Sequence, residues 1–214
     1  MIEGVIFDMD GVLIDSEEYI CQAAIKFLKT KGVDAKPEDF VPFVGAGEDR
    51  YIGGVAEKYG LALDMEDAKR ETYTIYGEMI HGNLGPLPGA KEFIAKAKAK
   101  GLKLAVASAA DRMKVNMNLR EIGIPEESFH AVVTGSDVTH KKPHPEIFLT
   151  AAEKMGLSPR NCLVVEDAIN GIRAGLSAGC RCLGIMTSFS RDDLAGAEWF
   201  AVNLAEAPEE CLLW

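Results

Sequence analysis

The sequence has no long apolar run and no excess of positive charge. No segment approaches the roughly 18–20 apolar residues of a membrane helix, so we expect no transmembrane span. Its 23 lysines and arginines are outnumbered by 33 aspartates and glutamates, which gives a formal net charge of −10. Nucleic-acid-binding domains are typically basic, and anionic lipid surfaces repel acidic proteins. We therefore expect neither a nucleic-acid partner nor a membrane partner.

The sequence also lacks the patterns of paired cysteines and of a secretory leader, and we expect neither. The five cysteines are an odd number without a CxxC pair, which argues against a disulfide framework or a zinc site. The N-terminal segment MIEGVIFDMDGVLIDSEE lacks a basic stretch and carries early acidic residues, unlike a secretory signal. We predict a cytoplasmic, monomeric protein in which the cysteines stay reduced.

The chain does contain short apolar runs that recur at intervals. Its 214 residues are 48% hydrophobic and 26% charged, an ordinary globular composition. Each run has about four to six residues and is followed by polar residues or glycine, which is typical of buried parallel strands. The runs cover residues 3–7, 102–107, 130–133, 162–165, 181–185 and, more weakly, 200–202.

Segments with helical spacing alternate with the later runs. Strands that alternate with helices of about 10–12 residues predict βαβ units and an open parallel sheet. The expected helices cover residues 89–100, 111–122, 145–155 and 169–178.

The segment between the first two runs breaks this alternation. Three helix-like stretches follow one another there without a convincing strand, and the stretch 82–89, rich in glycine and proline, then resembles a linker. We therefore predict an α/β fold with a core made of residues 1–15 and 86–214 and an inserted helical cap made of residues 16–85. The expected cap helices cover residues 17–31, 49–59 and 65–80.

Charged and hydroxyl side chains follow the ends of four predicted strands. Ligands of open α/β sheets bind outside the carboxyl ends of the strands, so we expect these side chains to meet at one rim. In strand order they are Asp8, Asp10 and Gly11; Ser108; Thr134, Ser136, Lys141 and Lys142; and Glu166 and Asp167.

The carboxylates at this rim predict a magnesium site. Asp8 and Asp10 are two residues apart and repel each other unless a cation lies between them or one holds a proton. A set of carboxylate oxygens without histidine or cysteine suits Mg²⁺. The candidate metal residues are Asp8, Asp10, Glu166 and Asp167.

A metal beside a carboxylate at a strand tip favours phosphoryl transfer, in which positioning and electrostatic stabilisation carry most of the catalysis. Asp8 is the expected nucleophile, because a carboxylate can accept a phosphoryl group. Asp10 is the expected general acid and base. Lys142, Ser108 and the backbone N–H groups of the following turn can hold phosphate oxygens. The predicted phosphate-binding set is Ser108, Ala109, Lys142 and Gly11.

Four segments resemble, in order, the motifs of the haloacid dehalogenase-like hydrolase superfamily, most of all its β-phosphoglucomutase-like phosphatase branch. They are FDMDGVLIDS, VASAAD, KKPHPEIF and VVEDAINGI, which span nearly the whole chain. The resemblance implies a Rossmann-like core with a helical cap and a small phosphate ester as substrate. It implies the same roles for Asp8 and Asp10, and a magnesium shell of Asp8, the Asp10 backbone carbonyl, Glu166 and Asp167.

The cap carries weaker signals. The segment VGAGEDR, with Gly45, Gly47 and Glu48, is not a dinucleotide-binding loop, because Arg50 occupies the sixth position and no strand precedes it. In members of the family an arginine near this place meets a distal phosphate, which makes Arg50 a candidate substrate residue at an unusual spacing. The alternative is a solvent-facing arginine. His140 and His144 flank the lysine motif and either line the site or lie on the surface.

The leading hypothesis is a Mg²⁺-dependent phosphatase with a phospho-aspartate intermediate on Asp8, and the nearest alternative is a sugar phosphomutase. β-Phosphoglucomutases carry a histidine at the start of the cap where this sequence has Ile20. Isoleucine cannot exchange a proton, which favours water as the phosphoryl acceptor. The mutase hypothesis then requires Glu17 or His81 to replace that histidine.

Other classes fit the sequence less well. Dehalogenases of the superfamily lack the second aspartate that Asp10 provides. A phosphoacceptor signalling domain needs only about 120 residues and would not explain the cap. A non-catalytic phosphate-binding protein is disfavoured by the intact motif residues, although a fold alone does not establish turnover.

Overall fold

The computed structural model describes residues 1–43 and 47–214. Its centre is a six-stranded, wholly parallel sheet in the order β3-β2-β1-β4-β5-β6. Every predicted strand is present, and each end lies within one residue of the predicted end. The strands are β1 (Gly4–Phe7), β2 (Lys103–Ala107), β3 (Ala131–Val133), β4 (Cys162–Glu166), β5 (Arg181–Ile185) and β6 (Trp199–Ala201).

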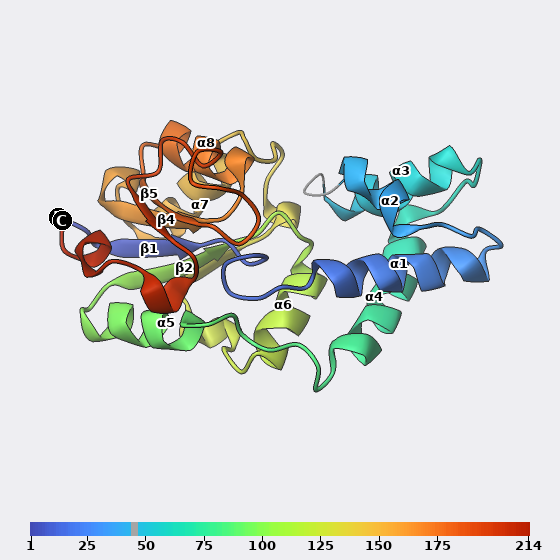
Figure 1. Cartoon of the computed structure of the whole chain (residues 1–214), viewed down its shortest axis with the longest axis horizontal. Helices are drawn as coiled ribbons and strands as arrows, with labels where there is room; N and C mark the ends of the chain where they lie inside the picture. The colour runs from blue at the N-terminus through green and yellow to red at the C-terminus, as the bar shows by residue number, and fades with distance from the viewer. Residues whose placement is uncertain (44–46) are drawn as a thin grey trace.

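Helices cover both faces of the sheet. Helix α5 and helices α7 and α8 lie on opposite faces (Figure 1). Val5 and Phe7 belong to the apolar cluster that includes residues of α5 and α6, whereas Ile6 between them belongs to the cluster that includes residues of α7 and α8. Because both faces are buried, the strands read as continuous apolar runs rather than as alternating patterns. These helices are α5 (Ala90–Ala99), α6 (Arg112–Glu121), α7 (Glu146–Met155) and α8 (Ile169–Ala178). The cysteines are free thiols, as the sequence predicts.

Further helices form a separate layer beside the carboxyl end of the sheet (Figure 1). The long helices α1 and α4 pack along each other and bury aromatic side chains such as Phe27 and Tyr76. The prediction missed α2, which is a single turn and too short to produce a periodic pattern. These helices are α1 (Glu17–Thr30), α2 (Pro37–Phe40), α3 (Glu48–Lys58) and α4 (Met65–Ile80). Within the described part of the chain, no helix is both long and apolar enough to cross a bilayer.

The predicted α/β fold with inserted helices is confirmed, and the division at residues 15/16 and 85/86 stays a prediction. The two connections to the inserted helices lie side by side. Ile14 forms an isolated antiparallel bridge with Pro86, and the Leu87 N–H donates to the Leu13 carbonyl at 2.9 Å. Helix α4 also contacts α6 of the core. These contacts hold the inserted helices next to the strand ends that carry the candidate site.

Candidate active site

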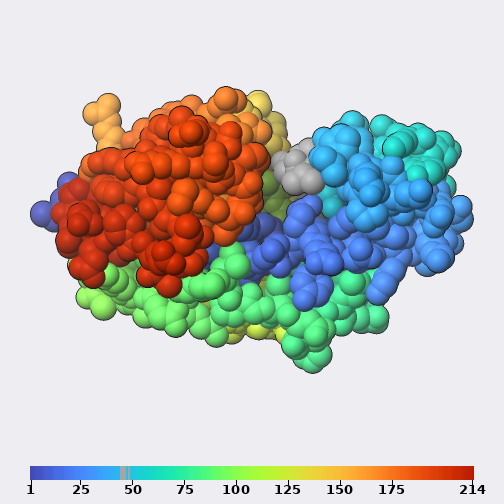
Figure 2. All heavy atoms as spheres, viewed as in Figure 1, coloured from blue at the N-terminus to red at the C-terminus, as the bar shows by residue number. Residues whose placement is uncertain are grey.

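The strand pairing brings three segments of the chain to one point. Phe7 of β1 is paired with Val106 of β2 and with Val165 of β4, so the residues that follow these strands leave the sheet together. Strands β2 and β3 lie on one side of β1, and β4, β5 and β6 lie on the other, so the strand order reverses at β1. Open α/β sheets bind their ligands at such a point. A cavity of about 710 Å³ opens there, lined by strand ends of the core and by residues of α1 and α3. Figure 2 shows the surface hollowed between these two parts.

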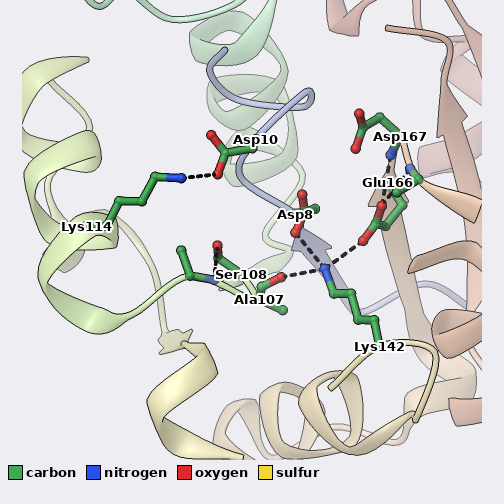
Figure 3. Close-up of polar contacts among 10 residues, drawn as sticks. Asp8, Asp10, Ala107, Ser108, Lys114, Lys142, Glu166 and Asp167 are labelled. Atoms are coloured by element: carbon green, nitrogen blue, oxygen red, sulfur yellow. Dashed lines mark hydrogen bonds and ion pairs between the residues drawn. The ribbon is translucent and has the colours of Figure 1, made fainter. Parts of the chain in front are cut away.

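Lys142 joins two of the acidic side chains (Figure 3). Its Nζ atom donates to Asp8 Oδ1 at 2.6 Å, to Glu166 Oε1 at 2.6 Å and to the Ala107 carbonyl at 3.1 Å. Burial alone would lower the pKa of Lys142, but the charges of Asp8 and Glu166 outweigh burial and raise it above its ordinary value. The side chain is therefore a permanent cation at the floor of the cavity.

The buried carboxylates of Asp8, Glu166 and Asp167 form an acidic cluster with oxygen atoms within 4.8 Å of one another. Burial raises the pKa of Asp8 well above its usual value; Lys142 opposes this shift, and the other two acids add to it. Burial, reinforced by Glu166, raises the pKa of Asp167 to about 7. A single ammonium group does not balance three carboxylates, so the cluster fits a divalent cation held by oxygen ligands.

The members of the acidic cluster differ in how many of their oxygens are already used. Glu166 Oε1 accepts from Lys142, and its Oε2 accepts from the N–H groups of Asp167 and Ala168, each at 3.0 Å. Asp167 Oδ2 accepts a short hydrogen bond from the Ser188 hydroxyl. Asp8 and Asp167 are thus better suited to direct metal contact than Glu166, which suits a contact through water.

The carboxylate of Asp10 lies apart from the acidic cluster (Figure 3). Its Oδ1 accepts a short hydrogen bond from the Ser16 hydroxyl, and its Oδ2 accepts from Lys114 Nζ at 3.2 Å. The structure therefore does not bring this carboxylate among the other acids. It lines the cavity between Ser16, which precedes α1, and Lys114 of α6.

The predicted phosphate-binding residues all line the cavity. Ser108 is buried, and its Oγ accepts from the Ala110 N–H at 3.2 Å, which leaves the hydroxyl proton available to donate. The Gly11 N–H is already engaged, because it donates to the Ile14 carbonyl at 2.7 Å. Gly11 instead has a positive φ of 79°, and a Cβ atom there would collide with the Asp167 carboxylate. Glycine at this position therefore allows the two segments to approach each other.

Three further candidate residues, Arg50, His140 and His144, do not line the cavity. Arg50 is not among the residues that line the cavity: its Nη1 lies 3.5 Å from Glu57 Oε2, and its guanidinium stacks over the Phe43 ring. Gly45 and the side chain of Glu48 lie outside the described residues. His140 and His144 are exposed and do not line the cavity.

Sequence reasoning missed several residues that complete the site. Two of them, Thr187 and Ser188, follow the end of β5. Thr187 Oγ1 donates to the Gly11 carbonyl at 2.6 Å, and the Ser188 hydroxyl donates to Asp167. The strand-end rule that found the other groups would have found these two. Lys114 gave no such signal, because it lies on α6, 104 positions after Asp10. Arg173 of α8 also lines the cavity.

Comparisons with known proteins identify the family of the chain. The family model described as haloacid dehalogenase-like hydrolase matches residues 5–185. The chain is 34% identical over 227 residues to the "Phosphorylated carbohydrates phosphatase" of Thermotoga maritima, a match that covers 99% of this chain and 97% of that protein. It is 40% identical over 200 residues to the "Protein SUPPRESSOR OF QUENCHING 1, chloroplastic" of Arabidopsis thaliana, a match that covers 92% of this chain but only 19% of that longer protein.

Solved structures with the same fold include a phosphate complex. The crystal structure of CbbY from Rhodobacter sphaeroides in complex with phosphate superposes with a TM-score of 0.87 at 29% identity, over 96% of each chain. The β-phosphoglucomutase of Clostridium difficile superposes with a TM-score of 0.82 at 26% identity, over 100% of this chain and 96% of that one. The predicted Rossmann-like core is thus confirmed, and the chain belongs to the haloacid dehalogenase-like hydrolase family.

Proposed function

We propose that the protein is a Mg²⁺-dependent phosphatase that hydrolyses a phosphorylated sugar or a similar small phosphate ester through a phospho-aspartate on Asp8. The observation that carries this proposal is the contact of Asp8 with Lys142 at 2.6 Å, next to Glu166 and Asp167, at the floor of a cavity of about 710 Å³. A carboxylate beside a fixed cation and a metal-binding cluster suits attack on a phosphoryl group.

Each residue has a defined task in this reaction. Asp8 attacks the phosphorus atom, so that a new O–P bond forms while the bond from phosphorus to the substrate oxygen breaks. Asp10 gives a proton to that departing oxygen. In the second half-reaction Asp10 takes a proton from water, which attacks the phospho-aspartate and releases inorganic phosphate. Ser108 and the backbone at Ala109 hold the phosphoryl oxygens.

The acidic cluster supports a bound Mg²⁺, which Asp8 and Asp167 would hold directly and Glu166 through water. When bound, this ion would neutralise charge on the phosphoryl group. The contacts of Asp10 with Ser16 and Lys114 keep its carboxylate away from the acidic cluster. The two aspartates of the first motif can therefore have separate roles, one as nucleophile and one as proton carrier.

The lining of the cavity supports an anionic substrate. Lys114 is paired with Asp10, and Lys142 is paired with Asp8. Arg173 is the further cation among the described lining residues, and we propose that it faces a second anionic group of the substrate. Arg50 remains a proposed substrate contact that would first have to leave Glu57. An Arg173→Ala variant should raise KM with little change in kcat, since the proposed contact is with a second anionic group and not with the phosphoryl group that is transferred.

The alternative function is a sugar phosphomutase, which the likeness to a β-phosphoglucomutase supports. Ile20 is buried and lines the cavity where a proton-exchanging residue would be required. His81 is 87% exposed and lies 3.5 Å from Glu121, so it is not in position to replace a histidine there. Glu17 lines the cavity and burial raises its pKa, which makes it the mutase candidate. We favour the phosphatase because Ile20 cannot exchange a proton and because Arg50, which pairs with Glu57, does not line the cavity.

Two assays test this proposal. Phosphate release from p-nitrophenyl phosphate, with and without Mg²⁺, separates an enzyme from a phosphate-binding protein. β-Glucose 1-phosphate with catalytic glucose 1,6-bisphosphate then separates the two enzymes. Glucose 6-phosphate that forms much faster than inorganic phosphate would overturn the phosphatase. Inorganic phosphate from a sugar phosphate without isomerisation would support it. The cytoplasmic location and the monomeric state stay predictions.

A further inference from the structure

Three side chains that commonly bind metals meet where the loop that carries Lys142 joins the start of α7, outside the active-site cavity. They are His140, His144 and Glu146, and one ligand atom of each lies within 4.8 Å of the others. His140 Nδ1 lies 2.7 Å from Glu146 Oε2, and His144 Nδ1 lies 3.8 Å from the same oxygen. The two imidazole ring centroids are 4.5 Å apart. Neighbouring ligand atoms of a tetrahedral Zn²⁺ are about 3.3 Å apart. This separation lies between the two distances from the histidine Nδ1 atoms to Glu146 Oε2.

We propose that His140, His144 and Glu146 form a binding site for a divalent transition-metal ion of the Zn²⁺ class, separate from the acidic cluster. Two imidazoles and one carboxylate favour such an ion over Mg²⁺, which prefers oxygen ligands. The side chains of His140 and His144 are 62% and 51% exposed, so an ion can enter from solvent and keep water as a further ligand.

The carboxylate of this site is already fixed in place. Glu146 Oε1 accepts from the Thr139 N–H at 2.8 Å, and its Oε2 accepts from the His140 N–H at 2.9 Å. These hydrogen bonds lower the pKa of Glu146 to about 2, so the ligand is ionised at neutral pH. A ligand that is held before the ion arrives loses little conformational freedom on binding.

A purely structural role without metal competes with this proposal. The hydrogen bond between His140 and Glu146 would then serve only to shape the loop, and the Glu146 N–H donates to His144 Nδ1 at 3.3 Å. That bond is long, and His144 can still offer Nε2 to an ion after its ring turns. The structural role and the metal site differ in one measurable respect, which is binding of Zn²⁺ by the folded chain.

The position of the site gives binding a structural consequence. His140 and His144 lie two residues before and two residues after Lys142, whose ammonium group contacts Asp8 and Glu166. An ion held by both histidines would close the loop around Lys142. Since the ion binds the folded chain, it should also raise the melting temperature.

The test is a calorimetric titration of the folded, full chain with ZnCl₂ in excess MgCl₂, which occupies the acidic cluster. We expect about one Zn²⁺ per chain. His140→Ala and His144→Ala should each weaken binding at least about tenfold, because even the loss of an outer contact costs that much. His81→Ala removes an exposed histidine elsewhere and should leave binding unchanged. Absence of Zn²⁺ binding, or equal binding by all variants, would overturn the site.

Two further measurements locate the bound ion within the protein. Asp167→Ala should retain Zn²⁺ binding, whereas loss of binding in this variant would assign the ion to the acidic cluster instead. A Cu²⁺ complex of the unaltered protein, studied by electron paramagnetic resonance, should show coupling to imidazole nitrogens. This spectrum does not depend on whether a variant folds. A spectrum without nitrogen coupling would contradict the proposal.

Discussion

Lys142 Nζ lies 2.6 Å from Asp8 Oδ1, although the two residues are 134 positions apart in the sequence. The contact connects the tip of the central strand to the loop that precedes α7. Burial works against the charged form of Asp8, and the Lys142 ammonium works in favour of it. The proposed nucleophile thus depends for its ionised form on a cation that only the folded chain supplies.

Replacement of Asp8 should abolish turnover without unfolding the protein. Asp8→Asn keeps the side-chain size and removes the attacking charge, so we expect kcat to fall by about 10³-fold or more. Folding should survive because a carboxylate is removed from a crowded acidic cluster and Lys142 keeps Glu166 as a partner. Steady-state phosphate release and thermal unfolding measure both effects. Asp34→Asn, at an exposed position, is the matched control. A variant that keeps a tenth of the normal rate would show that Asp8 is not the nucleophile.

Removal of an acidic ligand should change the metal requirement. Asp167→Ala should raise the Mg²⁺ concentration needed for half-maximal activity, and EDTA should abolish the activity of the unaltered protein. Asp192→Ala, at an exposed position, should leave this requirement unchanged. Ca²⁺ should support turnover poorly, because its larger and looser ligand shell misplaces nucleophile and phosphate. Full activity in EDTA would refute the proposed metal dependence.

Gly11 and Gly32 offer a paired test of the approach between Gly11 and Asp167. Both have a positive φ, 79° and 85°, so an alanine strains the backbone at either position by about 1–2 kcal/mol. A Cβ at Gly32 meets nothing within 4 Å, whereas a Cβ at Gly11 meets the Asp167 carboxylate. We expect both alanine variants to lose stability and only Gly11→Ala to require more Mg²⁺. Equal Mg²⁺ requirements in the two variants would argue against the proposed role of Asp167.

The inserted helices should move toward the core when the site is filled. Their two connections lie side by side at Ile14 and Pro86, which allows a hinge at one position. Small-angle scattering with Mg²⁺ and beryllium fluoride, a phosphate mimic, should give a smaller radius of gyration than the unliganded protein. Identical scattering curves would count against closure and leave the chemistry of the site untouched.

Asp39 should make the stability of the inserted helices depend on pH. The Lys58 ammonium, the Lys36 N–H and the Tyr59 hydroxyl lower the pKa of Asp39 below its ordinary value. A lowered carboxyl pKa stabilises the folded state fully above about pH 4 and progressively less as pH falls below the unfolded value. The difference in melting temperature between the unaltered protein and Asp39→Asn should therefore be largest at neutral pH and shrink below pH ~4. A difference that is constant with pH would contradict this assignment.

The strands and the acidic residues of the candidate site could be predicted because they depend on local pattern. Apolar runs that end in Asp8, Ser108 and Glu166 mark strands buried on both faces, and parallel pairing requires their carboxyl ends to meet at one edge. The lengths of α4 and α8 followed from helical periodicity in the same way. The single turn α2 was not predicted because four residues are too few to show the periodic spacing of apolar residues in a helix.

Contacts between elements that are far apart in the chain could not be predicted from the sequence. Lys114 reaches Asp10 only because α6 packs where the inserted helices join the core, and Arg50 is exposed because α3 directs it toward Glu57. The sequence by itself determined the order of strands along the chain, the motif residues and the acidic character of the site, since each depends on neighbours in the chain. Tertiary structure alone decided which cations meet which carboxylates, because such pairs form across segments whose separation is set by packing rather than by sequence position.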